Sequence, residues 1–221
     1  MLSVVVLASG RGSNLIAIDQ ACRRGDLPAR IRAVVSNNPD APVLSYASRQ
    51  GIDHICLDHR RYPSREAFDQ ALQQHIDRYA PGLVVLAGFM RILSPPFIRH
   101  YKDKLINIHP SLLPRFPGLN THARALAAGV HEHGASVHFV TEKVDQGPVI
   151  VQAVVPVYAD DTAETLARRT LEREHLIFPL AIKWFAQRRL RRHDGQWYLD
   201  GQPLTAPRRI PFEQTVDLKN D

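Results

Sequence analysis

Hydrophobic positions in the first half of the chain follow two alternating spacings. Helical spacing predicts helices over Asn14–Arg24, Pro42–Gln50 and Ser64–Tyr79. Ser94-Pro95 predicts the start of a further helix, with serine as the N-cap and proline in the first turn. Short apolar runs between them are typical of strands buried on both faces. These runs are Leu2–Leu7, Ile31–Val35, Ile55–Leu57, Leu83–Ala87 and Leu105–Ile108. The alternation predicts an α/β fold with a Rossmann-like, mostly parallel sheet and helices on both faces.

The second half has a different pattern. Ala135–Val140 and Val149–Val157 are separated by a turn sequence and are expected to pair as antiparallel strands. A long helix is expected to begin near Asp161, which with Glu164 could form a capping box. Asp-Gly pairs, which favour tight hairpin turns, occur at Asp194-Gly195 and Asp200-Gly201. The C-terminal part therefore adds antiparallel strands and a long helix to the parallel sheet.

Composition and charge narrow the class of protein. The chain has 221 residues, 44 % of them hydrophobic, and only two cysteines, which excludes a mainly disordered chain and a disulfide scaffold. No apolar run approaches the ~20 residues of a membrane-spanning helix, and we expect a cytoplasmic protein with no membrane partner. The net charge of +6 favours anionic partners, either nucleic acid or a phosphorylated metabolite. The basic run Arg188–Arg192 lacks aromatic residues that stack on bases, which favours a solvated helix end over a nucleic-acid site.

A glycine-rich turn, Ser9–Asn14, connects the first strand to the first helix. Backbone N–H groups at such a helix start favour an anion. Leu15 stands where a dinucleotide fingerprint has its third glycine, and Asn37-Asn38 replace the acidic residue expected after the second strand. A single phosphate held by Gly12, Ser13 and Asn14 therefore fits better than a dinucleotide. The alternative is a tight turn without a ligand.

Asn107 and His109 end the fifth predicted strand, with their side chains on the same side. An amide donor beside an imidazole suits stabilisation of an oxyanion together with proton transfer. Asp145, in the turn between two later strands, is either a turn residue or the carboxylate that raises the pKa of His109. Glu174 falls on the core-facing stripe of the long helix, where it needs an Arg partner or a ligand amine or hydroxyl.

Some chemistries find no support in the sequence. Cys22 and Cys56 are isolated, and His131 and His133 do not form a ligand set, so no metal is expected. The chain has no nucleophile elbow for a catalytic serine. If the protein is an enzyme, the substrate is expected to bring its own nucleophile.

Together these motifs resemble the folate-dependent glycinamide ribonucleotide formyltransferases of purine biosynthesis. The resemblance extends from Leu2 to about Trp197. Methionyl-tRNA formyltransferases typically have Ala where this chain has Pro110, and they carry an added C-terminal domain. Formyltetrahydrofolate deformylases carry an extra N-terminal regulatory domain. The segments that carry the resemblance are Ser9–Leu15, Leu86–Leu93, Asn107–Pro114, Ser136–Val140, Asp145–Ile150 and Glu174–Pro179.

The resemblance implies a role for each matched position. Asn107, His109 and Asp145 match the catalytic residues. Gly12, Ser13 and Asn14 match the phosphate-contacting loop, and Glu174 matches a contact to the amino nucleotide. The positions implied for the folate are Arg65, Met90, Arg91, Ile92, Leu93, Asn107, Thr141, Glu142, Lys143, Val144 and Asp145. A single formyltransferase domain over 1–221 follows, with a nucleotide-binding half (1–106), a folate and catalytic half (107–205) and a loose tail (206–221).

The implied reaction is direct attack of the amine of glycinamide ribonucleotide on the formyl carbon of 10-formyltetrahydrofolate. Asn107 and protonated His109 would stabilise the tetrahedral intermediate. The implied co-substrate is 10-formyltetrahydrofolate, the partners are small molecules without nucleic acid, and the chain is expected to be a monomer or a homodimer. The alternatives are a formyltetrahydrofolate hydrolase and a non-catalytic basic nucleotide- or RNA-binding module.

Overall fold

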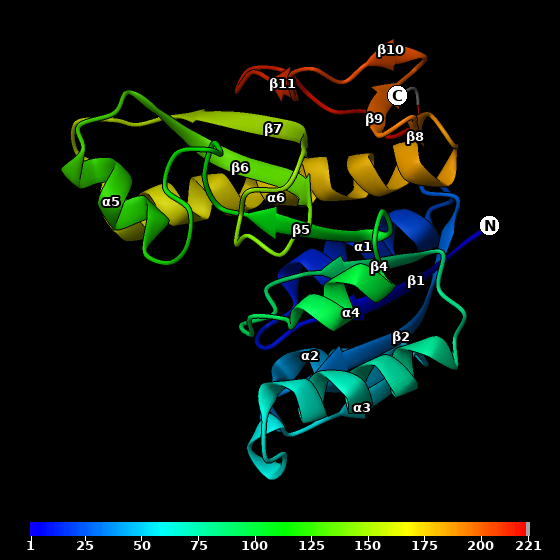
Figure 1. Ribbon diagram of the computed structural model, residues 1–221. Coiled ribbons are helices and arrows are strands. Elements are labelled where there is room, and N and C mark those ends of the chain that lie inside the picture. Colours follow the sequence, from blue (N-terminus) through cyan, green and yellow to red (C-terminus); the bar gives the residue numbers. More distant parts are fainter. Residues whose placement is uncertain (220–221) are drawn as a thin grey trace. The chain divides into compact units, whose positions relative to one another are not determined.

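A computed structural model describes residues 1–219 (Figure 1). The chain forms two compact units, Met1–Asn107 and Ile108–Asp221. The predicted tail 206–221 lies in the second unit, and its last two residues, Asn220 and Asp221, lie outside the described residues.

The first unit alternates strands with helices, as the sequence predicts. Its strands are β1 (Leu2–Leu7), β2 (Ala29–Ser36), β3 (Asp53–Cys56), β4 (Leu83–Leu86) and β5 (Leu105–His109), whose last two residues continue into the second unit. Its helices are α1 (Ser13–Arg23), α2 (Pro42–Arg49), α3 (Arg65–Asp77) and α4 (Pro95–His100), with a short 3₁₀ turn at His59–Arg61.

The strands of the first unit lie in the order β3-β2-β1-β4-β5, and every neighbouring pair is parallel. The predicted mostly parallel sheet is therefore confirmed. Because crossover connections are right-handed, the reversal of strand order at β1 places α1 and α2 on one face and α3 and α4 on the other. In such sheets the carboxyl ends of the strands beside the reversal, here β1 and β4, are where ligands bind. Val4–Leu7 of β1 and Leu83–Val85 of β4 are fully buried.

Local sequence explains where these helices begin. The Ser64 hydroxyl caps α3 by accepting the Ala67 N–H at 3.1 Å. Pro42 and Pro95 begin α2 and α4, where a missing N–H costs nothing. Gly12 precedes α1 in the left-handed region, with φ of 78°. A side chain there would be strained whatever the surrounding space.

The second unit contains the predicted antiparallel strands and long helix. β6 and β7 pair antiparallel, and β8, β9 and β10 form a small antiparallel sheet. Figure 1 shows α6 running alongside β6 and β7, which it contacts. The elements are α5 (Thr121–Ala127), β6 (Glu132–Phe139), β7 (Val149–Pro156), α6 (Ala163–Ala186), β8 (Leu190–His193), β9 (Gln196–Leu199), β10 (Gln202–Pro203) and β11 (Arg208–Ile210).

Two details of the second unit differ from expectation. The capping box of α6 is formed by Thr162 and Thr165, not by Asp161 and Glu164. Asp161 is engaged elsewhere, because Arg169 donates to both of its carboxylate oxygens, at 2.7 and 2.8 Å. Within the expected loose tail, Arg208–Ile210 forms β11 and pairs parallel to β7.

Candidate active site

The second unit places His109 beside Asp145. His109 ends β5, and its side chain is 7 % exposed; Asp145 lies in the turn between β6 and β7. Nδ1 of His109 is 3.4 Å from Oδ2 of Asp145. Nε2 lies 3.0 Å from the carbonyl oxygen of Phe116, and because a carbonyl only accepts hydrogen bonds, Nε2 carries a hydrogen. The ring therefore presents an N–H donor on one edge and faces a carboxylate on the other.

The pKa of His109 is shifted downward, opposite to the upward shift that the sequence predicts. Burial lowers the pKa of His109, although the Phe116 carbonyl and the Asp145 carboxylate each act to raise it. Asp145 thus contributes in the predicted direction, but desolvation of the ring outweighs it. A pKa below its ordinary value favours the neutral imidazole at pH 7, and the adjacent carboxylate would stabilise any positive charge placed on the ring.

Asp145 is held by contacts that the sequence did not predict. Oδ2 accepts the Gly118 backbone N–H at 2.8 Å, and Oδ1 is 3.6 Å from Nε2 of His138. Burial raises the pKa of Asp145, but hydrogen bonding to His138 and Gly118, together with the charges of His109 and His138, outweighs burial and holds the pKa below its usual range. His138 on β6 therefore supports the carboxylate.

The turn that carries Asp145 is tight at Gly147. A Cβ on Gly147 would lie 1.7 Å from the carbonyl oxygen of Phe139, so no side chain fits there. The same turn contains the segment Thr141–Asp145 implied for the folate. Thr141 donates its hydroxyl to the Lys143 carbonyl, and the side chains of Glu142, Lys143 and Val144 are exposed.

Asn107 precedes His109 by two residues on β5 and is half-buried. Alternation along a strand directs both side chains to the same face. The backbone of Asn107 is paired with Leu86 of β4.

In the first unit, Ser9 connects three strand ends. Its hydroxyl donates to Oδ1 of Asn37 at 2.5 Å and accepts the Met90 N–H at 2.7 Å. Asn37 stands where a dinucleotide site would have an acidic residue, and here it orients the serine. The glycine-rich turn after β1 is therefore fixed to the loops that follow β2 and β4. The sequence did not single out Ser9 for this role.

The structure gives Gly12 a packing reason as well as a conformational one. A Cβ on Gly12 would lie 2.4 Å from Cγ2 of Val43. A Cβ on Gly10 would meet no heavy atom within 4 Å, and the φ of Gly10 is not in the left-handed region. Ser13 is half-buried and Asn14 is buried in the first turn of α1.

The loop after β4 exposes two apolar side chains. Met90 is 67 % exposed and Ile92 61 %, whereas Leu93 is buried. Arg91 lies over the ring of Phe68, 5.8 Å from its centroid. Arg65 begins α3, and its exposed guanidinium is 3.3 Å from its neighbour Glu66.

Glu174 is buried on α6, as its place on the helical stripe predicts. The preceding Arg173 is also buried, and it donates to the carbonyl oxygens of Pro211 at 2.9 Å and Gln214 at 3.0 Å. These contacts join the C-terminal segment to α6.

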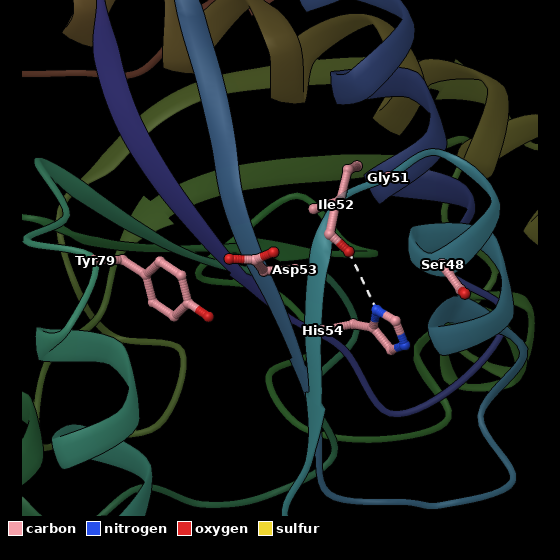
Figure 2. A pocket seen from close by; sticks show the side chains of 6 residues that line it. All are labelled: Ser48, Gly51, Ile52, Asp53, His54 and Tyr79. Carbon is pink, nitrogen blue, oxygen red and sulfur yellow. Dashed lines mark hydrogen bonds between the residues drawn. The ribbon is translucent and has the colours of Figure 1, made fainter.

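A separate cavity of about 400 Å³ lies at the amino end of β3 (Figure 2). Asp53, His54 and Ser48 at its wall are exposed, and His54 Nδ1 is 3.1 Å from the Ile52 carbonyl oxygen. It contains none of the predicted site residues. Among residues 1–219, no cluster of three His, Cys, Asp or Glu side chains is arranged to hold a metal ion. No helix in this described part is long and apolar enough to cross a membrane.

Comparison with known proteins adds a consistent result. Residues 2–182 match the family model described as formyl transferase. The chain is 53 % identical to phosphoribosylglycinamide formyltransferase of Escherichia coli K12, over 92 % of this chain and 96 % of that protein. The solved phosphoribosylglycinamide formyltransferase of Coxiella burnetii is 50 % identical, with a TM-score of 0.91 over 95 % of this chain and 99 % of that chain. A formyltetrahydrofolate deformylase from Pseudomonas syringae is 28 % identical, with a TM-score of 0.82 over 90 % and 65 % of the two chains.

Proposed function

The chain belongs to the formyl transferase family, and we propose that it transfers the formyl group of 10-formyltetrahydrofolate to the amine of glycinamide ribonucleotide, in de novo purine biosynthesis. The full-length similarity to phosphoribosylglycinamide formyltransferases supports this substrate pair. The observation that carries the chemistry is the buried His109, with an N–H donor at Nε2 and the Asp145 carboxylate beside Nδ1.

The reaction begins when the amine attacks the formyl carbon and forms a carbon–nitrogen bond, while the carbonyl electron pair moves onto oxygen. Nε2–H of His109 donates to this oxyanion when the formyl oxygen takes the place of the Phe116 carbonyl. The side-chain amide of Asn107 supplies the second donor.

Collapse of the intermediate completes the transfer. A proton leaves the attacking nitrogen for Nδ1 of His109, relayed through water, and the Asp145 carboxylate stabilises the imidazolium. The bond from carbon to N10 then breaks, and N10 receives the proton. The products are the ribonucleotide with a formylated amine and tetrahydrofolate. Atoms and charge therefore balance without a protein nucleophile.

The remaining predicted residues divide between the two substrates. Gly12, Ser13 and Asn14 at the start of α1 hold the phosphate of the ribonucleotide, and Glu174 accepts from its amine or hydroxyls. Exposed Met90 and Ile92 provide apolar surface for the folate ring, together with Arg91 and Leu93. Thr141, Glu142, Lys143, Val144 and Asp145 form the second folate segment, and Arg65 pairs with the glutamate tail.

The proposed partners are these two small molecules, without nucleic acid, in a cytoplasmic monomer or homodimer. Both cysteines are free, Cys22 half-buried and Cys56 exposed, which fits a reducing compartment.

The test is a formyl-transfer assay of the purified protein with 10-formyltetrahydrofolate, with and without glycinamide ribonucleotide. We expect formylated nucleotide only when both are present. His109→Ala and Asn107→Ala should each reduce turnover by a factor on the order of 10²–10³, because each removes an oxyanion donor. His131→Ala, which alters an exposed histidine of the same unit, is the matched control.

Formate release that is independent of the ribonucleotide would favour a formyltetrahydrofolate hydrolase, the activity suggested by the deformylase-like neighbour. Salt-sensitive nucleic-acid binding without turnover would favour the basic binding module. Near-normal turnover in both folded alanine variants would remove His109 and Asn107 from the chemistry.

A further inference from the structure

The loop between β4 and α4 is anchored at both ends by side chains from other elements. At its start, the Ser9 hydroxyl accepts the Met90 N–H at 2.7 Å. At its end, Oδ2 of Asp69 accepts the Ser94 N–H at 2.5 Å. Between these two anchors, Met90 and Ile92 are among the most exposed apolar side chains of the described residues.

Asp69 is an unusual residue to find at this position. It lies on α3 next to Phe68, on the helix face that packs inward, and it is only 2 % exposed. Burying a carboxylate is costly unless it is hydrogen-bonded. Burial raises the pKa of Asp69, while hydrogen bonding to Ser94 and the positive charges of Arg65 and Arg91 oppose the rise. Packing alone would favour an apolar residue here, so a specific contact explains the carboxylate.

α3 therefore holds the loop at two neighbouring points. Phe68 lies under the guanidinium of Arg91, and Asp69 binds the backbone at Ser94. Ser94 is itself 2 % exposed, so its N–H has no water to replace a lost partner. These contacts restrain the segment Met90–Leu93, in which Leu93 is buried and the side chains of Met90 and Ile92 stay exposed.

We propose that Asp69 is a positioning residue for the formyl-folate site, which through Ser94 fixes the loop whose Met90 and Ile92 receive the folate ring. This inference rests on the proposed function for the identity of the ligand. Asp69 touches neither substrate and takes no part in proton transfer. Its contribution is to spare the loop the entropic cost of ordering when the folate binds.

The test compares Asp69→Ala with Asp69→Asn. The alanine variant removes the acceptor, so we expect the KM for 10-formyltetrahydrofolate to rise about tenfold, the equivalent of one hydrogen bond to a charged group. The KM for glycinamide ribonucleotide should change less than about twofold, and kcat at saturation should be largely retained. Asn keeps an acceptor oxygen of the same shape, so Asp69→Asn should recover most of the folate affinity.

Asp77→Asn is the matched control, because Asp77 is on the same helix and accepts the Tyr101 hydroxyl at 2.7 Å instead of a loop amide. It should leave both KM values unchanged. Amide hydrogen exchange gives an assay-independent readout. Asp69→Ala should speed exchange across residues 90–94, and Asp77→Asn should not.

Each outcome decides a separate question. Equal rises of both KM values, an unchanged folate KM, or unchanged exchange in folded Asp69→Ala would each overturn the positioning role. If the alanine variant does not fold, Asp69→Leu replaces it, because leucine fills the same space without an acceptor; it should show the same rise in the folate KM and the same faster exchange at residues 90–94. If the unaltered protein fails to transfer formyl groups, the proposed function fails, while hydrogen exchange still decides whether Asp69 anchors the loop.

Discussion

Single residues show how one position can satisfy both packing and chemistry. Gly12 was expected to leave room for a phosphate, yet its φ of 78° and the nearby Val43 require glycine even without a ligand. Gly10, in the same turn before α1, has neither a positive φ nor a close neighbour for a Cβ. Substitutions at Gly12 and at Gly10 can therefore distinguish a requirement for folding from a requirement for phosphate binding.

In Gly12→Ala, the left-handed backbone alone should cost about 1–2 kcal/mol of stability. The close contact with Val43 should add to that loss. Gly10→Ala should leave the free energy of unfolding within about 0.5 kcal/mol, but weaken ribonucleotide binding if the phosphate approaches this turn. Denaturant unfolding and calorimetric titration measure the two effects. Unchanged ribonucleotide affinity in Gly10→Ala would place the phosphate elsewhere.

Asp145 allows a prediction about pH. Because burial lowers the pKa of His109 and Asp145 opposes this, removing the carboxylate should lower the pKa of His109 further. The proposed mechanism uses the neutral ring to take up a proton, so kcat/KM should fall on the acid side as His109 becomes protonated. Asp145→Asn should shift this acid limb to lower pH and reduce the plateau rate. An acid limb at the same pH in both proteins would contradict the pairing.

At the scale of elements, the turn between β6 and β7 carries Asp145 to His109. Its path depends on the close approach of Gly147 to the Phe139 carbonyl, where a Cβ would come within 1.7 Å. β7 is a nearly continuous apolar run, β6 mixes apolar with polar residues, and both strands are buried along most of their length. The position of the carboxylate is set by backbone packing that no period-two pattern records.

Gly147→Ala should therefore displace this turn and lower turnover by at least about tenfold, with a loss of about 1–3 kcal/mol from overpacking. Gln146→Ala, at an exposed position of the same turn, should leave both quantities near their original values. Thermal unfolding and formyl transfer are measured on each variant. Full activity in Gly147→Ala would show that the turn adapts without moving Asp145.

At the scale of the whole molecule, the second unit contains four histidines whose pKa values are lowered chiefly by burial: His109, His122, His133 and His175. His133 is the most affected, with its pKa lowered to about 4. Its Nε2 is 3.1 Å from Nδ1 of His122, so protonating both rings would place two like charges together.

Stability should consequently fall as pH decreases below about 6.5, because the unfolded chain then binds more protons than the folded one. For His133 alone, the shift from 6.5 to about 4 corresponds to about 3 kcal/mol, lost progressively across that interval. Denaturant unfolding between about pH 7 and pH 5 measures the slope. His133→Gln should flatten it, whereas a free energy of unfolding that is constant over this window would contradict the effect.

The sequence predicted those features of the fold and site that depend on residues close together in the chain. Apolar runs located β1 to β7, helical spacing located α1, α2, α3 and α6, and Ser94-Pro95 located the start of α4, each within a few residues. Burial of one helix face imposes a helical period, and burial of both strand faces gives a continuous apolar run. Helix α5 was missed, since Thr121–Ala127 is short and follows a proline-rich loop. The motifs also singled out His109 and Asp145 as candidates, and the structure places His109 Nδ1 3.4 Å from Asp145 Oδ2.

The sequence by itself determined the order of strands and helices, the α/β class, and the resemblance that named the catalytic candidates. Only the tertiary structure decided what surrounds them: Phe116 and Asp145 on either side of the His109 ring, Ser9 between three strand ends, and Asp69 beneath the loop after β4. The division has a physical cause. Periodicity and turn preferences act between residues near in sequence, whereas desolvation and hydrogen bonding depend on groups that folding brings from distant positions.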